Sequence, residues 1–293
     1  MSIIDDIKNT FRLQHNGLNR LLLVNVIVFI AANLCKGILG LSGYSFMPVE
    51  VNMALASDFS FFVEHFWTLF TYMFPHLDFF HIFFNMLWLY SIGTVFSEFL
   101  GSKRLVGVYV LGGLAGGLLF IAIGSLLPGT HAGGILLGAS AGVMAIVIAA
   151  AVYSPNLVMN VFLLGPVRLK YIALVCFILT SLIDIDSVNT GGKISHIGGA
   201  AFGLLFAWQY RKGNDLSRGI TGIFDSVLHL FSRRPKSSIK VAYKRAVPDD
   251  VYNEMKVNEQ KRVNEILDKI SRSGYDSLSK EEKDFLFHAS RKM

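Results

Sequence analysis

Residues 105–167 form the longest stretch of this chain without an Asp, Glu, Lys or Arg. These 63 residues are enough for two crossings of a lipid bilayer, because a spanning helix needs about 20 consecutive apolar residues. The whole chain has a similar character, since 53% of its residues are hydrophobic and only 16% are charged. The sequence therefore predicts an integral, multi-pass membrane protein rather than a soluble domain.

Apolar segments elsewhere in the chain predict four more spans, which makes an all-α bundle of six. The six predicted spans lie near residues 21–35, 79–97, 105–127, 137–153, 171–183 and 194–210. The connection at 37–70 is long and rich in aromatic residues, and we expect it to lie in the membrane interface, where aromatic rings are favoured. An even number of spans places both termini on one side of the membrane.

The charges alternate between the two sets of span ends. One set carries basic residues: Lys8, Arg12, Arg20, Lys103, Arg104, Arg168, Lys170, Arg211 and Lys212. The opposite set is mainly acidic, with Lys193 as a basic exception: Glu50, Asp58, Glu64, Asp184 and Asp186. Because basic loops stay in the cytoplasm, this pattern predicts that the N- and C-termini are both cytoplasmic.

The part of the chain after the sixth span has a different composition. Residues 211–245 hold nine basic and two acidic residues, and apolar residues between 223 and 231 fall on one helical face. We interpret 212–248 as a basic amphipathic linker, which either lies on the inner leaflet or packs on the protein. Residues 249–293 predict a small helical extension of two helices, with Gly274 ending the first and Ser279 beginning the second. The extension either docks on a partner or pairs with itself.

Four polar residues stand at the outer ends of three predicted spans: His81, Asn85, Ser140 and His196. Polar groups in such positions are costly in lipid and tend to face the protein interior or water. A serine and a histidine together provide a nucleophile and a base. His81 and Asn85 are four residues apart, so they share a helix face and can donate hydrogen bonds to an oxyanion. The backbone N–H of Ser140 is a further donor at a helix start.

Structural roles are the alternative for each of these residues. Ser140 is also the kind of residue that packs between membrane helices, and His196 is also suited to a buried interhelical hydrogen bond. His81 and Asn85 could tie the long loop to the second span. His76 is expected nearer the surface, in a structural or interfacial role.

Metal, cofactor and nucleic-acid binding have little support in the sequence. It contains no CxxC, HExxH or phosphate-loop pattern, so we expect no metal and no cofactor. Cys35 and Cys176 lie in apolar runs and are interpreted as packing residues. Asp184 and Asp186 are interpreted as solvated loop residues. Membrane topology explains the basic tail, so no nucleic-acid partner is expected.

Three motifs in order carry a family resemblance: His76-x4-His81-x3-Asn85, Gly138-Ala139-Ser140 and Ser195-His196-x-Gly198-Gly199-x3-Gly203. Together they resemble the rhomboid family of intramembrane serine proteases over roughly residues 18–211, after a cytoplasmic segment at 1–17. The six-span count is similar to that of the bacterial members, which implies a bacterial inner membrane. The oligomeric state stays open.

The resemblance implies a serine endopeptidase with a Ser–His dyad and no third carboxylate. Ser140 would be the nucleophile and His196 the base, while His81 and Asn85 would stabilise the oxyanion. Glycines near His196 would let the sixth span approach the fourth closely enough for a hydrogen bond between the two residues. The implied partners are the bilayer and membrane-anchored substrate proteins, cut in or near the outer part of a transmembrane segment.

The sequence departs from the family pattern at three positions. Ala141 follows the serine where Gly is common, Met144 stands where many members have a Tyr stacked on the base, and Thr68 replaces an arginine. The alternative function is a non-catalytic rhomboid-like protein that binds transmembrane helices, although such proteins usually lack the nucleophile or the base and this chain has both. A transporter is disfavoured, because we see neither an inverted repeat nor paired interrupted helices.

Overall fold

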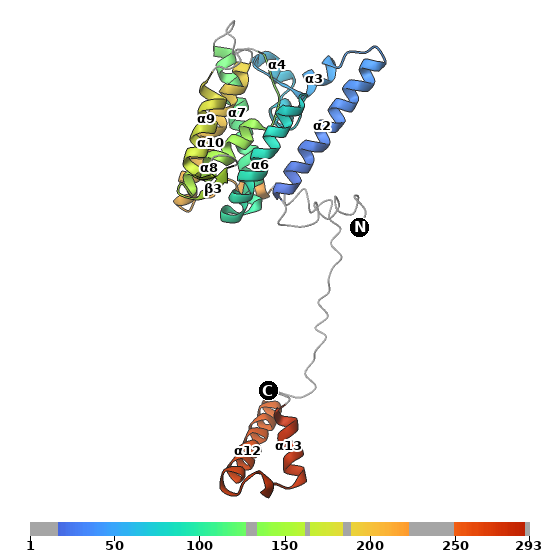
Figure 1. Cartoon of the computed structure of the whole chain (residues 1–293). Helices are drawn as coiled ribbons and strands as arrows, with labels where there is room; N and C mark the ends of the chain where they lie inside the picture. The colour runs from blue at the N-terminus through green and yellow to red at the C-terminus, as the bar shows by residue number, and fades with distance from the viewer. Residues whose placement is uncertain (1–16, 127–133, 162–164, 184–188, 223–248, 291–293) are drawn as a thin grey trace. The chain divides into compact units, whose positions relative to one another are not determined.

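The computed structural model describes residues 17–126, 134–161, 165–183, 189–222 and 249–290 (Figure 1). The chain divides into two compact units, residues 1–233 and 234–293, here named the membrane unit and the C-terminal unit. The predicted N-terminal segment lies almost wholly outside the described residues, as do Asp184, Asp186 and the linker residues 223–248.

The membrane unit is built from long apolar helices, and the predicted all-α membrane fold is confirmed. They are α2 (Gly17–Leu41), α6 (Phe79–Leu100), α7 (Ser102–Leu126), α8 (Ser140–Tyr153), α9 (Leu169–Phe177) with the π-helical turn η1 (Ile178–Leu182), and α10 (Thr190–Arg211). Among the described residues, α2, α6 and α7 are long and apolar enough to cross a bilayer, whereas α8 and the α9–η1 pair are shorter apolar helices. The count of six spans stays a prediction.

Short elements fill the connection between α2 and α6. It holds the helices α3 (Met47–Met53), α4 (Phe59–Glu64) and α5 (Thr68–Thr71), and the strand β1 (Leu55–Ala56). Strand β1 pairs antiparallel with β2 (Ile135–Leu136), just before α8. The loop predicted at 37–70 therefore begins later than expected, because α2 continues to Leu41.

Two span boundaries were predicted wrongly, and both affect the polar residues. The fourth span begins at Ser140 and not at Leu137. Residues 135–136 pair with β1, and Gly138 has a φ of 121°, which is incompatible with a helix at that residue. The sixth span begins at Thr190 and not at Ile194, because the Asn189 side chain caps its first turn. His196 thus lies in the second turn of α10 rather than the first.

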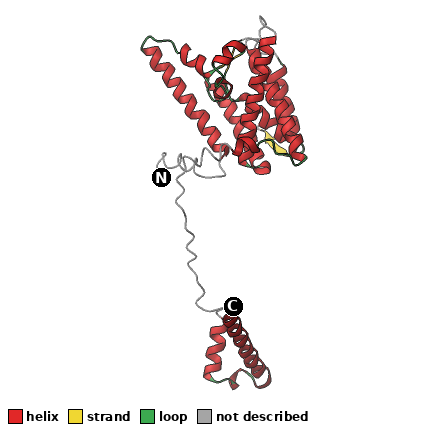
Figure 2. Ribbon diagram, turned by 180° about the vertical axis from the view of Figure 1, so that it is seen from behind, coloured by secondary structure: helices red, strands yellow, loops and turns green. Residues whose placement is uncertain are grey.

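Helices α7, α8 and α10 form the core, and α2 lies at its edge. Ten of the 14 residues of α8 are buried, whereas α2 leans away from the bundle toward its C-terminal end (Figures 1 and 2). On α10, Gly199 and Gly203 lie directly against the backbone of Ala141 and Ala145 of α8, where a Cβ would collide. The predicted close approach of the fourth and sixth spans is therefore present.

The far end of α8 is closed by the hairpin of β3 (Val158–Val161) and β4 (Gly165–Arg168), which leads into α9. Arg211, the last residue of α10, donates hydrogen bonds to the carbonyl oxygens of Val152 and Tyr153. Two of the α8 carbonyls that lack a partner within the helix are thus satisfied by a side chain from another element.

The C-terminal unit is a helical hairpin, as predicted. It contains α12 (Asp249–Ser273), the 3₁₀ turn η3 (Tyr275–Ser277) and α13 (Lys280–Ser290). Gly274 follows α12 with a φ of 77°. Ser279 and Glu282 cap α13 reciprocally, since the Ser279 N–H donates to the Glu282 carboxylate and the Glu282 N–H donates to the Ser279 hydroxyl.

Candidate active site

Ser140 is the first residue of α8, and the two residues before it are held by backbone hydrogen bonds. The Gly138 N–H donates to the carbonyl of Tyr72 at 2.8 Å, and the Ala139 N–H donates to Nε2 of His76 at 3.2 Å. Both acceptors belong to the connection between α5 and α6. The position of the half-buried Ser140 is therefore fixed by a segment some 60 residues earlier in the chain.

His76 is fully buried, so the expectation that it lies near the surface was wrong. Its Nε2 accepts a hydrogen bond from Ala139, and its Nδ1 lies 3.0 Å from the Phe74 carbonyl. Nδ1 therefore carries the proton and donates, which makes the ring neutral. Burial and the neighbouring His81 lower the pKa of His76 from 6.5 to about 4. His76 thus acts as an uncharged bridge to the loop before Ser140.

His81 and Asn85 lie on the first turns of α6, which Asp78 caps through the His81 backbone N–H at 2.8 Å. The His81 ring packs against Gly138, where an added Cβ would lie 2.7 Å from its Cε1. The amide nitrogen of the buried Asn85 donates to the His81 carbonyl at 2.9 Å. One of its two N–H groups is therefore engaged, and among the described residues no acceptor is seen for the other.

The imidazole of His196 is positioned by a carbonyl group of η1, the π-helical turn that follows α9. Its Nδ1 lies 3.1 Å from the carbonyl oxygen of Thr180. A carbonyl only accepts, so Nδ1 carries the proton and Nε2 is left with its lone pair. Carbonyls in the last turn of a helix lack a partner within it, which leaves that of Thr180 open to the imidazole.

Ser140, His81 and His196 lie at one end of the membrane unit, named here the serine end. The backbone of Ala141 contacts Gly199, which lies one turn beyond His196, so Ser140 and His196 both precede the same close contact of α8 with α10. His81 and His196 lie close enough to interact electrostatically. Within the described residues, no hydrogen bond joins Ser140 to His196.

The three departures from the family pattern have local explanations. Met144 is buried against Cys176 and Ala200, so it fills the space between α8, α9 and α10. The hydroxyl of the buried Thr68 donates to the His65 carbonyl at 2.6 Å. The methyl group of Ala141 lies against Gly116 of α7, which has no side chain in its way.

No sequence pattern indicates the Thr180 contact, because a π-helical turn cannot be predicted from hydropathy. Both cysteines have free thiols. Across the described parts of the chain, no group of three His, Cys, Asp or Glu side chains has a geometry suited to a metal ion.

The family model of the Rhomboid domain matches residues 63–213, which include all four predicted site residues. This chain belongs to the rhomboid family. The predicted rhomboid-like bundle is thereby confirmed, although the match begins after α2 and α3. A second model, of a family of unknown function called DUF6576, matches residues 248–292 of the C-terminal unit. No curated protein was found to match the chain.

Proposed function

We propose that this rhomboid protein is an intramembrane serine endopeptidase, with Ser140 as nucleophile and His196 as base. The observation that carries the proposal is the hydrogen bond of His196 Nδ1 to the Thr180 carbonyl. It fixes the tautomer in which Nε2 can accept the Ser140 hydroxyl proton, a task that a carboxylate performs in a catalytic triad. Family membership supports the same chemistry, because rhomboids are generally intramembrane serine proteases.

The proposed reaction is hydrolysis of a peptide bond in two steps, with Ser140 and His196 in the roles given above. Ser140 Oγ attacks the scissile carbonyl carbon while its proton passes to His196 Nε2, and the carbonyl oxygen becomes an oxyanion. His81, the second N–H of Asn85 and the Ser140 N–H stabilise that oxyanion. His196 then gives the proton to the leaving amine. A water molecule hydrolyses the acyl-enzyme by the same route and regenerates the hydroxyl of Ser140.

The length of α8 supports a substrate cut below the membrane surface. Its 14 residues span about 21 Å, against a hydrocarbon thickness of about 30 Å. If α8 ends at the membrane surface that carries the basic span ends, Ser140 lies several ångströms below the opposite surface. The substrates would be membrane-anchored proteins whose outer transmembrane residues can unwind. We infer from the charge pattern that both termini are cytoplasmic, in a bacterial inner membrane.

The test is cleavage of a single-span model substrate by the full chain in proteoliposomes. Ser140→Ala and His196→Ala are each expected to reduce turnover on the order of a millionfold, in effect to background. Ser154→Ala is the matched control, because Ser154 follows the opposite end of the same helix. If Ser140→Ala or His196→Ala retains the turnover of the wild type, the assigned dyad is wrong.

A non-catalytic role in binding transmembrane helices is the second candidate. It is favoured by one observation, the absence of a hydrogen bond between Ser140 and His196 within the described residues. A fluorophosphonate probe distinguishes the two functions, because it labels only an activated serine. Labelling of the wild type that is lost in both Ser140→Ala and His196→Ala supports the protease, whereas an unlabelled wild type supports the second candidate.

A further inference from the structure

The segment that fixes the residues before Ser140 is itself held by side chains from two helices. This segment, residues 72–76, is named here the strap. Its first part is attached to α7, since the Tyr109 hydroxyl donates to the Met73 carbonyl at 2.8 Å. Its last residue, His76, is attached to a different helix, α2.

Asn33 of α2 makes this second attachment through its side-chain amide. Its Nδ2 lies 2.9 Å from the carbonyl oxygen of Phe29, one turn earlier in α2, and 3.2 Å from the carbonyl oxygen of His76. Both partners are carbonyls, which only accept, so the amide nitrogen faces them and its two N–H groups serve one each. Because His76 is fully buried, water cannot replace Asn33 as the partner of its carbonyl.

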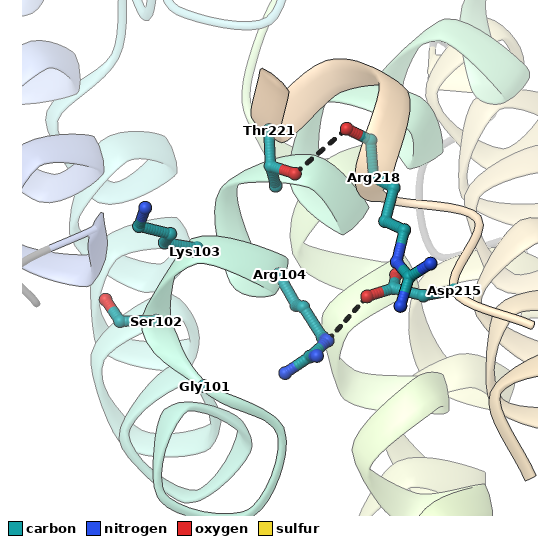
Figure 3. A pocket seen from close by; sticks show the side chains of 7 residues that line it. All are labelled: Gly101, Ser102, Lys103, Arg104, Asp215, Arg218 and Thr221. Atoms are coloured by element: carbon teal, nitrogen blue, oxygen red, sulfur yellow. Dashed lines mark hydrogen bonds and ion pairs between the residues drawn. The ribbon is translucent and has the colours of Figure 1, made fainter. Parts of the chain in front are cut away.

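Asn33 lies in the half of α2 that is mostly exposed. Only five of the 25 residues of α2 are buried, and four of these are among its first nine; the fifth is Ala32. Near the start of α2, Leu18 packs against Gly93 of α6, and its N–H donates at 3.4 Å to the hydroxyl of Ser102, the first residue of α7 (Figure 3). The two ends of α2 are thus attached to different parts of the membrane unit.

His76 links the Asn33 contact to the loop before Ser140. Its ring is fixed on both sides, because Nδ1 donates to the Phe74 carbonyl at 3.0 Å and Nε2 accepts from the Ala139 N–H at 3.2 Å. A shift of the His76 backbone therefore moves the acceptor of Ala139, the residue immediately before Ser140.

We propose that Asn33 is a positioning residue for Ser140, which acts through the backbone carbonyl and the ring of His76. Without the amide, a buried carbonyl of the strap loses its partner, and the strap relaxes together with the loop that it holds. A misplacement of the reacting groups by about 1 Å can cost on the order of 100-fold in rate. The effect on catalysis rests on the proposed function, whereas the effect on the loop does not.

The test replaces Asn33 by leucine, which has nearly the same shape, is favourable in lipid and donates no hydrogen bond. With the full chain in proteoliposomes, Asn33→Leu is expected to lower the rate constant for labelling by a fluorophosphonate probe about fivefold, as expected for one lost hydrogen bond. The fraction of protein that is finally labelled should equal that of the wild type. A purely structural role would instead lower the labelled fraction and leave the rate constant unchanged.

Leu18→Ala is the matched control, because it removes a buried side chain at the other end of α2 and leaves the strap intact. It should lower the stability of the protein and the labelled fraction without changing the rate constant. The proposal is overturned if Leu18→Ala slows labelling as much as Asn33→Leu does, or if Asn33→Leu is labelled at the rate of the wild type.

The route through His76 is tested with the double variant Asn33→Leu/His76→Ala. Without the imidazole, Asn33 has no connection to Ala139, so the double variant should be labelled no more slowly than His76→Ala alone. A further fivefold slowing in the double variant would mean that Asn33 acts by another route, and the proposal would fail.

Amide hydrogen exchange, measured by mass spectrometry, tests the position of the loop without any catalysis. In the peptide that contains Gly138 and Ala139, exchange should be faster in Asn33→Leu than in the wild type and unchanged in Leu18→Ala. Unchanged exchange in Asn33→Leu overturns this proposal, whatever the probe shows. An unlabelled wild type combined with faster exchange in Asn33→Leu overturns the proposed function alone and leaves Asn33 as the residue that fixes the loop.

Discussion

At the serine end, the rings of His76 and His196 are held by uncharged hydrogen bonds, whereas at the opposite end, named here the basic end, the contacts involve charged side chains. His76 bridges to Ala139 and His196 bonds to the Thr180 carbonyl. The opposite end instead uses the pair Arg104–Asp215 and the cation Arg211. Neutral partners cost less to bury in a low-dielectric interior, while charges are tolerated where headgroups and water are close. The two ends should therefore differ in how tightly they must pack and in how they respond to pH.

The largest difference is expected from adding one methyl group at each end. Gly199→Ala would push a Cβ into the Ala141 backbone, which cannot move aside as a side chain can. We expect a loss of about 3 kcal/mol or more in the free energy of unfolding. Gly219→Ala is the matched change at the basic end, where a Cβ meets nothing within 4 Å. It should be neutral or stabilising by up to about 1 kcal/mol, because it replaces a helical glycine.

Reversible unfolding in mixed detergent measures both variants. Equal destabilisation by the two substitutions would contradict the view that Gly199 depends on close backbone contact and Gly219 does not.

The pH response of the serine end is expected to come from His76. Its pKa is lower in the folded protein, about 4, than its ordinary value of 6.5, so the unfolded chain binds the proton more readily. The stabilisation by neutral His76 is complete above pH 6.5 and is lost as the pH falls toward 4. At pH 4.5 the loss should reach about 2 kcal/mol.

His76→Gln, which does not titrate, is the comparison for this effect. It should be less stable than the wild type at pH 7, by about 1–3 kcal/mol, because the Phe74 carbonyl loses its Nδ1–H donor. Its stability should change less between pH 7 and pH 4.5. Parallel pH profiles for the two proteins would rule out His76 as the titrating group.

The smallest effect is expected at the basic end. Asp215→Asn removes the charge that pairs with Arg104, whose side chain is 36% exposed, so we expect a loss of only about 1 kcal/mol at pH 7. The pKa of Asp215 is lowered by its hydrogen bonds from Ser217 and Arg104, which outweigh burial. The stabilisation is therefore present above pH 3.8 and is lost only below it. If the difference in the free energy of unfolding between the wild type and Asp215→Asn already shrinks between pH 6.5 and 4.5, this assignment is contradicted.

The sequence predicted the membrane helices well, because hydropathy and charge report directly on burial in lipid. It also predicted the hairpin of the C-terminal unit, where Gly274 and Ser279 act through local backbone chemistry. The rhomboid motifs named the family and the four candidate site residues, although their roles stay proposals.

Features that depend on distant pairing were missed. The start of α8 was misplaced because residues 135–136 pair with a strand some 80 residues earlier. The burial of His76 and the Thr180 carbonyl contact also arise only when separate helices pack together.

Arg211 has a consequence for how the chain enters the membrane. The carbonyl groups at the end of α8 receive their partner from a residue synthesised 58 positions after Tyr153. Until that residue leaves the ribosome, α8 is a 14-residue helix with an uncapped end, too short to insert stably by itself. The serine-bearing helix should thus reach its final depth only at the end of translation of the membrane unit.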